Sequence, residues 1–277
     1  MIHEIFPHHF YNQFLALRDI GDEDYVLHYK ENSQLLKRSG EDFEIPRKKD
    51  LPGISNDSGF RYLFALNNVH CFLITSCPEI DYNLFIYQEI NFFRKYKQKE
   101  AAWISLVGFQ LMNWYAHNRF CGKCGAETTE KTDERALICP VCNTMVYPKI
   151  SPAIIVAIVC NDKILLAHSN NFPGKWYSLI AGYADIGESL EEAVMREVKE
   201  EVGLEVKNIR YYKSQPWPFS SSMMIGFFAE ADDKQRIQTD NKEISDAAWF
   251  NRGNLPDHPA QISIAGEMID KFEQGLI

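Results

Sequence analysis

Hydrophobic and polar positions change their pattern twice along this chain. Over the first 95 residues, short apolar runs (DYVLHY, RYLFALNNVHCFLIT, YNLFIY) alternate with polar, turn-forming stretches, which is typical of strands and their connections. The next apolar residues recur at helical spacing and predict a helix over about residues 99–117: Trp103, Ile104, Val107, Leu111 and Trp114. We therefore expect a strand-rich α+β domain over residues 1–115 that ends in this helix.

A second apolar pattern begins near residue 149. SPAIIVAIVC and KILLAHS, joined at Asn161-Asp162, are continuous apolar runs of strand length and predict a hairpin of buried strands. More strands are expected near VKNIRYY, SSMMIGFFAEA and AAWF, followed by a helix over about residues 260–275. A chain of 277 residues with 45% hydrophobic composition is long enough for two or three domains.

Acidic residues gather in GYADIGESLEEAVMREVKEEVGL, residues 182–204. The segment predicts one helix, with Gly182 entering it and Gly203 leaving it. On this helix Glu197 and Glu201 would be neighbours, with Cβ atoms about 5–6 Å apart, and Glu200 lies beside them. Like charges about 4 Å apart repel by roughly 4 kcal/mol at an effective dielectric of about 20. A cluster neutralised by a cation is therefore favoured over a solvated acidic helix, and oxygen ligands predict Mg²⁺ or Mn²⁺ bridging to phosphate.

Four cysteines form two C-x-x-C pairs with 14 residues between them: Cys121, Cys124, Cys139 and Cys142. Two such turns complete a tetrahedral sulfur site for one structural Zn²⁺, and Gly122 and Gly125 ease the backbone around it. A disulfide interpretation needs an oxidising compartment, of which the sequence gives no sign. The other cysteines lie in apolar surroundings and are expected to be buried: Cys71, Cys77 and Cys160.

Charge and hydropathy narrow the class of protein. A net charge of −9 and a pI near 5.4 argue against a general nucleic-acid binder. No apolar run reaches transmembrane length, and MIHEIFPHHF lacks a basic region followed by an apolar stretch. We expect a cytoplasmic protein without a membrane partner.

The acidic segment matches, at every fixed position, the sequence box of the Nudix hydrolases: Gly182, Glu188, Arg196, Glu197, Val198, Glu200, Glu201, Gly203 and Leu204. Ten residues later stands SQPWPF, residues 214–219, followed by SSSMM. Its prolines fix φ and present Trp217 and Phe219 rigidly, and such rings can stack on a base. Composition alone slightly favours a structural interpretation, in which these aromatic rings fill a gap in the core. The position of the motif after the acidic box favours base binding instead.

The chain resembles the NADH pyrophosphatase subfamily of the Nudix hydrolases over about residues 108–277. The resemblance rests on three motifs in this order: the two C-x-x-C pairs, the acidic box and SQPWPF. The resemblance implies a zinc ribbon over residues 116–148 and a Nudix α/β/α sandwich over residues 149–277. It also implies hydrolysis of NAD(H) to nicotinamide mononucleotide and AMP, removal of NAD caps from RNA 5′ ends, and a homodimer whose partner completes each site. The family array continues with proline where this chain has Ser220.

The resemblance also assigns site residues. Its catalytic metal ligands fall on the Ala181 carbonyl, Glu197, Glu201 and Glu243, although Asp240 and Asp246 lie near the last of these. Glu200 would be a ligand or the base for the attacking water, Arg196 would orient the glutamates, and Glu188 completes the acidic set. Substrate contacts fall on Glu134, Tyr147, Tyr183, Gln215, Pro216, Trp217, Pro218, Phe219, Ser220, Ser221, Ser222 and Ala265.

Two other functions stay open. A Nudix hydrolase could instead cleave ADP-ribose or diadenosine polyphosphates, or a zinc-ribbon RNA-binding protein could carry an inactive Nudix fold. The intact box argues against the second of these. A basic run at residues 94–97 is one candidate RNA contact, although short charge runs are more often solvated surface. Preference among NADH, NAD⁺ and capped RNA, the number of catalytic ions and the role of the N-terminal domain are not determined by the sequence.

Overall fold

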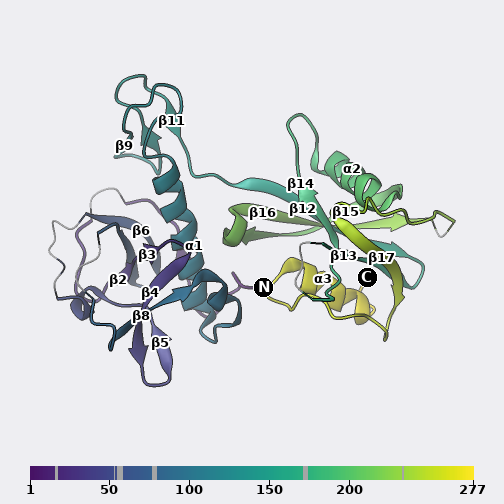
Figure 1. Cartoon of the computed structure of the whole chain (residues 1–277), viewed down its shortest axis with the longest axis horizontal. Helices are drawn as coiled ribbons and strands as arrows, with labels where there is room; N and C mark the ends of the chain where they lie inside the picture. The colour runs from purple at the N-terminus through teal and green to yellow at the C-terminus, as the bar shows by residue number, and fades with distance from the viewer. Residues whose placement is uncertain (16–17, 53, 55–58, 77–79, 171–173, 233) are drawn as a thin grey trace. The chain divides into compact units, whose positions relative to one another are not determined.

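The chain of the computed structural model divides between Lys149 and Ile150. His3–Lys149 form the N-terminal unit, and Ile150–Ile277 together with Met1–Ile2 form the C-terminal unit (Figure 1). The predicted division into three domains, with boundaries after residues 115 and 148, stays a prediction. The structure describes residues 1–15, 18–52, 54, 59–76, 80–170, 174–232 and 234–277.

The N-terminal unit begins with two small sheets. One has the order β1-β6-β7-β2, and the other joins β3, β4 and β5, with β8 also paired to β4. Their bounds are Phe10–Tyr11 (β1), Tyr25–Leu27 (β2), Tyr29–Lys30 (β3), Ser33–Ser39 (β4), Asp42–Glu44 (β5), Phe60–Leu66 (β6), Val69–Ile74 (β7) and Phe85–Glu89 (β8), with 3-10 turns at Lys48–Asp50 (η1) and Ile90–Lys95 (η2).

Helix α1, Lys99–His117, confirms the predicted helix. It packs closely on strand β3, because a Cβ atom added at Gly108 would collide with the Tyr29 hydroxyl and the Leu27 side chain. The Tyr29 hydroxyl also donates a hydrogen bond of 2.6 Å to the Ser105 carbonyl on this helix. After α1 the chain forms a three-stranded ribbon, β11-β10-β9, with bounds Thr129–Glu130 (β9), Leu137–Ile138 (β10) and Met145–Val146 (β11).

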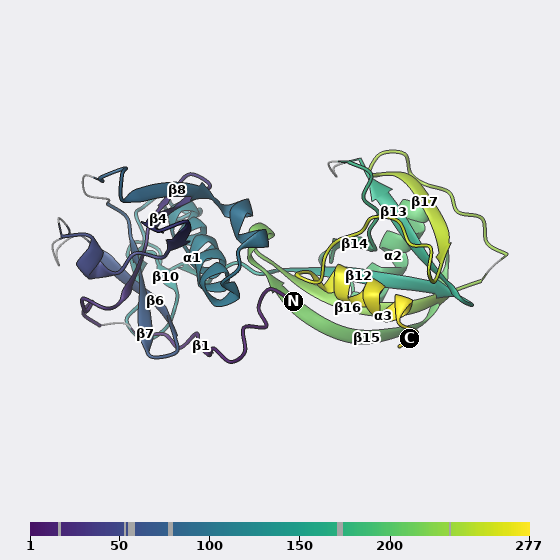
Figure 2. The ribbon, with the colours of Figure 1, turned by 90° about the horizontal axis from the view of Figure 1, so that it is seen from below.

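The C-terminal unit is built on a six-stranded sheet of order β15-β16-β12-β13-β17, with β14 also paired to β12. Helices α2, Leu190–Val202, and α3, Ile264–Glu273, cover opposite faces of this sheet (Figures 1 and 2). The strands are Ser151–Cys160 (β12), Lys163–Ser169 (β13), Ile180–Tyr183 (β14), Val206–Trp217 (β15), Ser222–Ala231 (β16) and Ile244–Asn251 (β17), with a 3-10 turn at Pro218–Ser220 (η3).

Strand β12 shows why this sheet has two cores. Ile154 and Val156 pack in the cluster that contains Val198 of α2, whereas Ile155 lies in the cluster that contains Met268 of α3. A strand buried on both faces is apolar at every position, which explains the run in β12. The α+β fold with a zinc-ribbon region and a C-terminal α/β/α sandwich is thereby confirmed.

Element boundaries differ from the sequence prediction at two helices. Gly182 lies in β14 instead of entering the acidic helix, which begins at Leu190 because Ser189 and Glu192 form a capping box. Helix α3 begins at Ile264 instead of near residue 260, because Ser263 is its N-cap. The β12–β13 hairpin is confirmed, with Asn161 at φ 51° in its turn.

Two smaller predictions can be compared with the structure. Cys71 and Cys160 are buried as expected, whereas Cys77 lies outside the described residues. Among the helices of the described chain, none combines the length and apolar character that crossing a bilayer requires.

Candidate active site

Helix α2 presents the acidic cluster because both of its ends are fixed locally. The Ser189 side chain accepts a hydrogen bond from the Glu192 N–H, and the Glu192 carboxylate accepts one from the Ser189 N–H. Gly203 ends the helix at φ 74°, a left-handed conformation that favours glycine. One face of the helix packs on the sheet through residues that include Val194 and Val198. Glu197 and Glu201 lie next to this face, three residues after Val194 and Val198 respectively, and Glu201 is buried with the valines.

Arg196 joins the helix to the loop before it. Its guanidinium donates to Glu188 at 2.6 and 3.0 Å, to Glu197 at 2.8 Å, to Glu200 at 3.1 Å and to the Tyr183 carbonyl at 3.0 Å. These hydrogen bonds raise the pKa of Arg196, and the bonds from Arg196 lower the pKa of Glu188 to about 2. Glu188 therefore stays ionised, and Arg196 fixes the geometry of the loop and helix together.

Glu201 is the most constrained carboxylate of the cluster. It is 7% exposed, and its Oε2 atom has no hydrogen-bond partner among the described residues. Burial, followed by the charges of Glu197, Glu243, Asp240 and Glu200, raises its pKa to about 8. A buried carboxylate with an unpaired oxygen beside like charges has the chemistry of a cation ligand.

Glu197 lies directly against the backbone of β14. A Cβ atom added at Gly182 would overlap the Glu197 carboxylate, so only glycine leaves room for this side chain. Burial raises the pKa of Glu197 despite its contact with Arg196. The Ala181 carbonyl belongs to the residue before Gly182, on the strand that the Glu197 carboxylate contacts.

Glu243 is presented by a turn that the sequence did not single out. The Asp240 carboxylate accepts the backbone N–H groups of Glu243 at 3.1 Å and Ile244 at 3.0 Å, and the Asp240 N–H donates to the Glu201 carbonyl at 3.2 Å. The bond from Ile244 lowers the pKa of Asp240. Asp246 accepts from the Tyr177 hydroxyl, so Asp240 and Asp246 both have structural partners. An aspartate three residues before a candidate ligand was the available signal for this turn.

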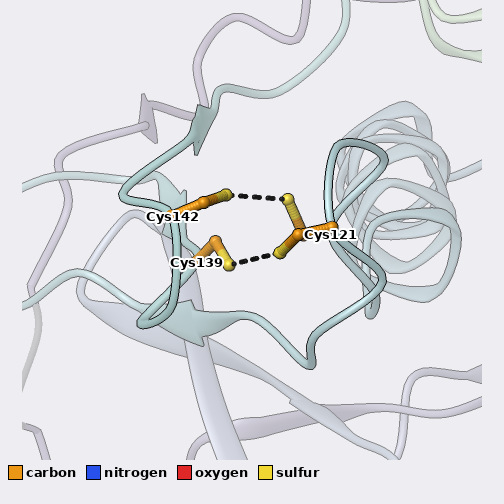
Figure 3. A group of neighbouring side chains, drawn as sticks. Cys121, Cys139 and Cys142 are labelled. Atoms are coloured by element: carbon orange, nitrogen blue, oxygen red, sulfur yellow. Dashed lines mark hydrogen bonds between the residues drawn. The ribbon is translucent and has the colours of Figure 1, made fainter.

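The cysteine pairs form a second, separate site in the N-terminal unit. Sγ atoms lie 3.6 Å apart for Cys121 and Cys142 and 3.4 Å apart for Cys124 and Cys139, and Figure 3 shows Cys121, Cys139 and Cys142 pointing toward one another. Four thiolates at about 2.3 Å from Zn²⁺ would lie about 3.8 Å apart, so this set fits one zinc ion.

Backbone geometry explains the convergence of the sulfurs. Gly125 and Asn143 each follow the second cysteine of a pair, at φ 76° and φ 56°. Their N–H groups donate to the carbonyls of Cys121 and Cys139 at 2.8 and 2.9 Å. Gly125 thus eases the backbone around the metal site as predicted, whereas Gly122 is not among the residues at positive φ. The sequence analysis did not identify Asn143, which has the equivalent role in the second pair.

Among the described residues, these cysteines are the one group of three or more potential ligands whose donor atoms lie within 4.8 Å of one another. The carboxylates of Glu197, Glu201 and Glu243 do not meet that criterion. Glu197 instead contacts Arg196. The assignment of the acidic residues as metal ligands therefore stays a prediction.

Residues of the SQPWPF array lie at the end of β15 and in the turn to β16. The Trp217 and Phe219 rings have centroids 4.9 Å apart, and the Ser220 and Ser222 hydroxyls lie 2.7 Å apart. Ser221 has φ 52° in this turn. Of the eight predicted contacts at residues 215–222, five are half-buried or exposed and three are buried: Gln215, Pro218 and Ser222.

Other predicted substrate contacts lie in different surroundings. Tyr183 is 53% exposed and lines a pocket of about 360 Å³ with Arg196 and Glu200. Ala265 is buried in the core beside α3. Glu134 and Tyr147 belong to the N-terminal unit, where the Tyr147 hydroxyl donates to Glu134 at 3.2 Å. Their roles as substrate contacts stay predictions.

Comparison with known proteins adds three domain matches. Residues 149–272 match the NUDIX domain, residues 116–147 the NADH pyrophosphatase zinc ribbon domain, and residues 23–114 the NADH pyrophosphatase-like rudimentary NUDIX domain. The zinc ribbon match agrees with the convergent cysteines, and the first match contains the acidic cluster of α2.

Individual relatives match over part of their length. A protein of Pseudomonas aeruginosa named "NAD-capped RNA hydrolase NudC" is 45% identical over 163 residues, which cover 59% of this chain and 58% of that protein. One of the same name from Stutzerimonas stutzeri is 43% identical over 178 residues, 64% of each chain. A NUDIX hydrolase structure from Nitrosomonas europaea aligns with a TM-score of 0.49 and 22% identity, over 56% of this chain and 90% of its own.

Proposed function

We propose that this chain, which belongs to the NUDIX family and has the zinc ribbon and rudimentary domain of NADH pyrophosphatases, hydrolyses the pyrophosphate bond of NAD(H). The products would be nicotinamide mononucleotide, in its oxidised or reduced form, and AMP. The substrate is part of the proposal, because the matched segment covers only 58% of the Pseudomonas aeruginosa relative.

The observation that carries this proposal is the state of Glu201. A carboxylate that is 7% exposed, has an unpaired Oε2 and lies among like charges is costly unless a cation is bound. A pyrophosphate substrate needs its charge neutralised, and the cluster lies beside the pocket lined by Tyr183, Arg196 and Glu200. The same group therefore accounts for both cation binding and reaction class.

In this mechanism Glu197 and Glu201, with Glu243 and the Ala181 carbonyl, hold the cation. When bound, Mg²⁺ or Mn²⁺ neutralises phosphate charge and lowers the pKa of a water molecule. Arg196 holds Glu188, Glu197 and Glu200 in position through charge-assisted hydrogen bonds. Glu200 either joins the ligands or accepts the proton of the attacking water; its exposed position at the pocket suits proton exchange with solvent.

NAD-capped RNA is the second candidate substrate. Relatives at 43% to 48% identity are named for it, and it contains the same pyrophosphate bond as NAD(H). Tyr183, which lines the pocket beside α2, is 53% exposed, so this pocket opens to solvent. We further propose that the enzyme works in the cytoplasm. We also propose that it forms a homodimer in which the partner chain completes the substrate site.

Product analysis tests the proposal directly. The purified zinc-loaded protein would be incubated with Mg²⁺ or Mn²⁺ and NADH, NAD⁺, NAD-capped RNA, ADP-ribose or diadenosine polyphosphates. AMP and the mononucleotide from NAD(H) are expected to form fastest among the small molecules. Preferred cleavage of ADP-ribose would overturn the NAD(H) assignment, and RNA binding without any cleavage would favour an inactive Nudix fold.

A further inference from the structure

Gln215 has a side chain that is fully used inside the protein. It is 0% exposed, its Nε2 donates to the Ile262 carbonyl at 2.9 Å, and its Oε1 accepts the Ile264 N–H at 2.6 Å. Both partners are backbone groups 47 and 49 residues further along the chain. A substrate could bind this amide only by breaking bonds that satisfy a buried polar group.

These two bonds end on the first turn of α3. Ile264 is the first residue of that helix, and its N–H is one of the four donors that a helix leaves without internal partners. The Ser263 hydroxyl accepts the Gly266 N–H at 3.2 Å. Gln215 therefore supplies a second cap to the same turn, from a distant strand.

Close packing gives the first turn of α3 little freedom to move. A Cβ atom at Gly226 of β16 would lie 2.7 Å from Ile264 Cδ1 and 3.0 Å from Met268 Sδ. A Cβ atom at Gly266 would collide with the backbone of residues 259–260. Glu267, one residue later, accepts hydrogen bonds from the Tyr212 hydroxyl at 2.5 Å and Lys213 Nζ at 3.0 Å. Three residues of strand β15 thus hold the start of α3: Tyr212, Lys213 and Gln215.

We propose that Gln215 is a positioning residue that fixes the start of α3, with Ala265, to strand β15, which carries Trp217 and leads into the turn that contains Phe219. The inference rests on the proposed function only in taking the array and Ala265 as parts of the substrate site. It differs from the sequence-based assignment, in which Gln215 itself contacts the substrate. Its expected signature is a change in KM with kcat retained.

The variant Gln215→Glu tests this directly, because an ionised carboxylate accepts from Ile264 but cannot donate to Ile262. A protonated carboxyl group can donate, and burial favours protonation. The KM for NADH, as a ratio to wild type, should be about tenfold at about pH 8 and approach one near about pH 6. The kcat ratio should stay within about twofold at both pH values, since Gln215 does not touch the reacting atoms.

Gln235 provides a matched control within the same unit. Its Nε2 donates to the Glu205 carbonyl at 2.8 Å, and its Oε1 accepts the Glu205 N–H at 2.7 Å, which is the same two-bond contact at the other end of β15. Gln235→Glu should leave KM unchanged across the pH range. Three outcomes would overturn the proposal. They are an equal KM change in both variants, a KM ratio of Gln215→Glu to wild type that does not vary with pH, and a loss of kcat at unchanged KM.

Amide hydrogen exchange separates this inference from the proposed function. At about pH 8, Gln215→Glu should speed exchange of the Ile264–Gly266 amides at least tenfold over wild type, with or without activity on NADH. Unchanged exchange there would overturn the positioning role even if NADH is hydrolysed. If Gln215→Glu does not fold, Ser263→Ala removes the other cap of the same turn and should raise KM with kcat retained; an unchanged KM would count against the inference.

Discussion

Two metal-binding patterns in this chain differ in how closely the structure brings their donor atoms together. In the N-terminal unit, four cysteine sulfurs converge within 4.8 Å, because backbone hydrogen bonds at Gly125 and Asn143 close each turn. In the C-terminal unit the glutamates do not converge, and Glu197 is held by Arg196. Neutral thiols can approach without charge repulsion, whereas carboxylates cannot. The four sulfurs can therefore lie close together in the folded ribbon, whereas the glutamates need a cation to offset their mutual repulsion.

The largest expected effect is loss of the ion from the cysteine site. Cys139→Ser removes a ligand that is 0% exposed. Structural zinc contributes an apparent ~10–16 kcal/mol in small zinc-binding peptides, so the variant should lose bound zinc and the cooperative melting of its ribbon. Zinc content by atomic emission and a thermal melt measure this. Cys160→Ser, a buried cysteine outside the cluster, should keep its zinc; equal zinc content in both variants would contradict the site.

The next effect is chemical and leaves the fold intact. Glu201→Gln keeps the size of the side chain but removes the charge that we propose binds the cation, so turnover should fall about 10³-fold, a loss of several kcal/mol of transition-state stabilisation. Steady-state rates at saturating Mg²⁺ measure it, and the zinc content should not change. Activity within about twofold of wild type would show that Glu201 is not at the reaction centre.

A smaller effect is expected at the glycine beneath the acidic cluster. Gly182→Ala places a Cβ atom against the Glu197 carboxylate, and a shift of about 1 Å in a catalytic group can cost about 10²-fold in rate. Gly122→Ala, within a cysteine pair but with no heavy atom within 4 Å of the added Cβ, should change neither zinc content nor rate. Equal kinetics for the two variants would show that the close contact between Gly182 and Glu197 does not matter for catalysis.

Per pH unit, the smallest effect is the pH dependence of stability. Without added divalent cation, Glu201 in the folded protein has a pKa raised to about 8 from 4.5, so it keeps a proton that the unfolded chain has lost. The free energy of unfolding should therefore fall as the pH rises from about 4.5 to about 8, by at most about 1.4 kcal/mol per pH unit. Urea titrations across this range measure the slope.

Two comparisons sharpen that measurement. Glu201→Gln should reduce the slope, leaving the part due to Glu197, whose pKa is also raised. Added Mg²⁺ should also reduce it, because the cation stabilises the ionised carboxylate. A wild-type slope equal to that of Glu201→Gln would show that Glu201 does not titrate in this range.

Sequence prediction succeeded where spacing along the chain carries the information. Cysteine spacing identified the zinc ligands, and helical spacing placed Glu197 and Glu201 together on α2. It did not reveal contacts between residues that are far apart in the sequence. Gln215 reads as a polar contact in a motif, yet its partners lie 47 and 49 residues away. The role of Asn143 was missed because asparagine, unlike glycine at position 125, is seldom read as a left-handed residue.

Met1 and Ile2 belong to the C-terminal unit although the next 147 residues belong to the other. The Met1 side chain lies in the core cluster with Phe272, and the Ile2 N–H donates to the Ile262 carbonyl at 2.9 Å. That carbonyl also accepts from Gln215. These two residues precede the N-terminal unit in the chain, yet their native contacts are with residues that follow it. They therefore cannot form those contacts until α3 has been synthesised.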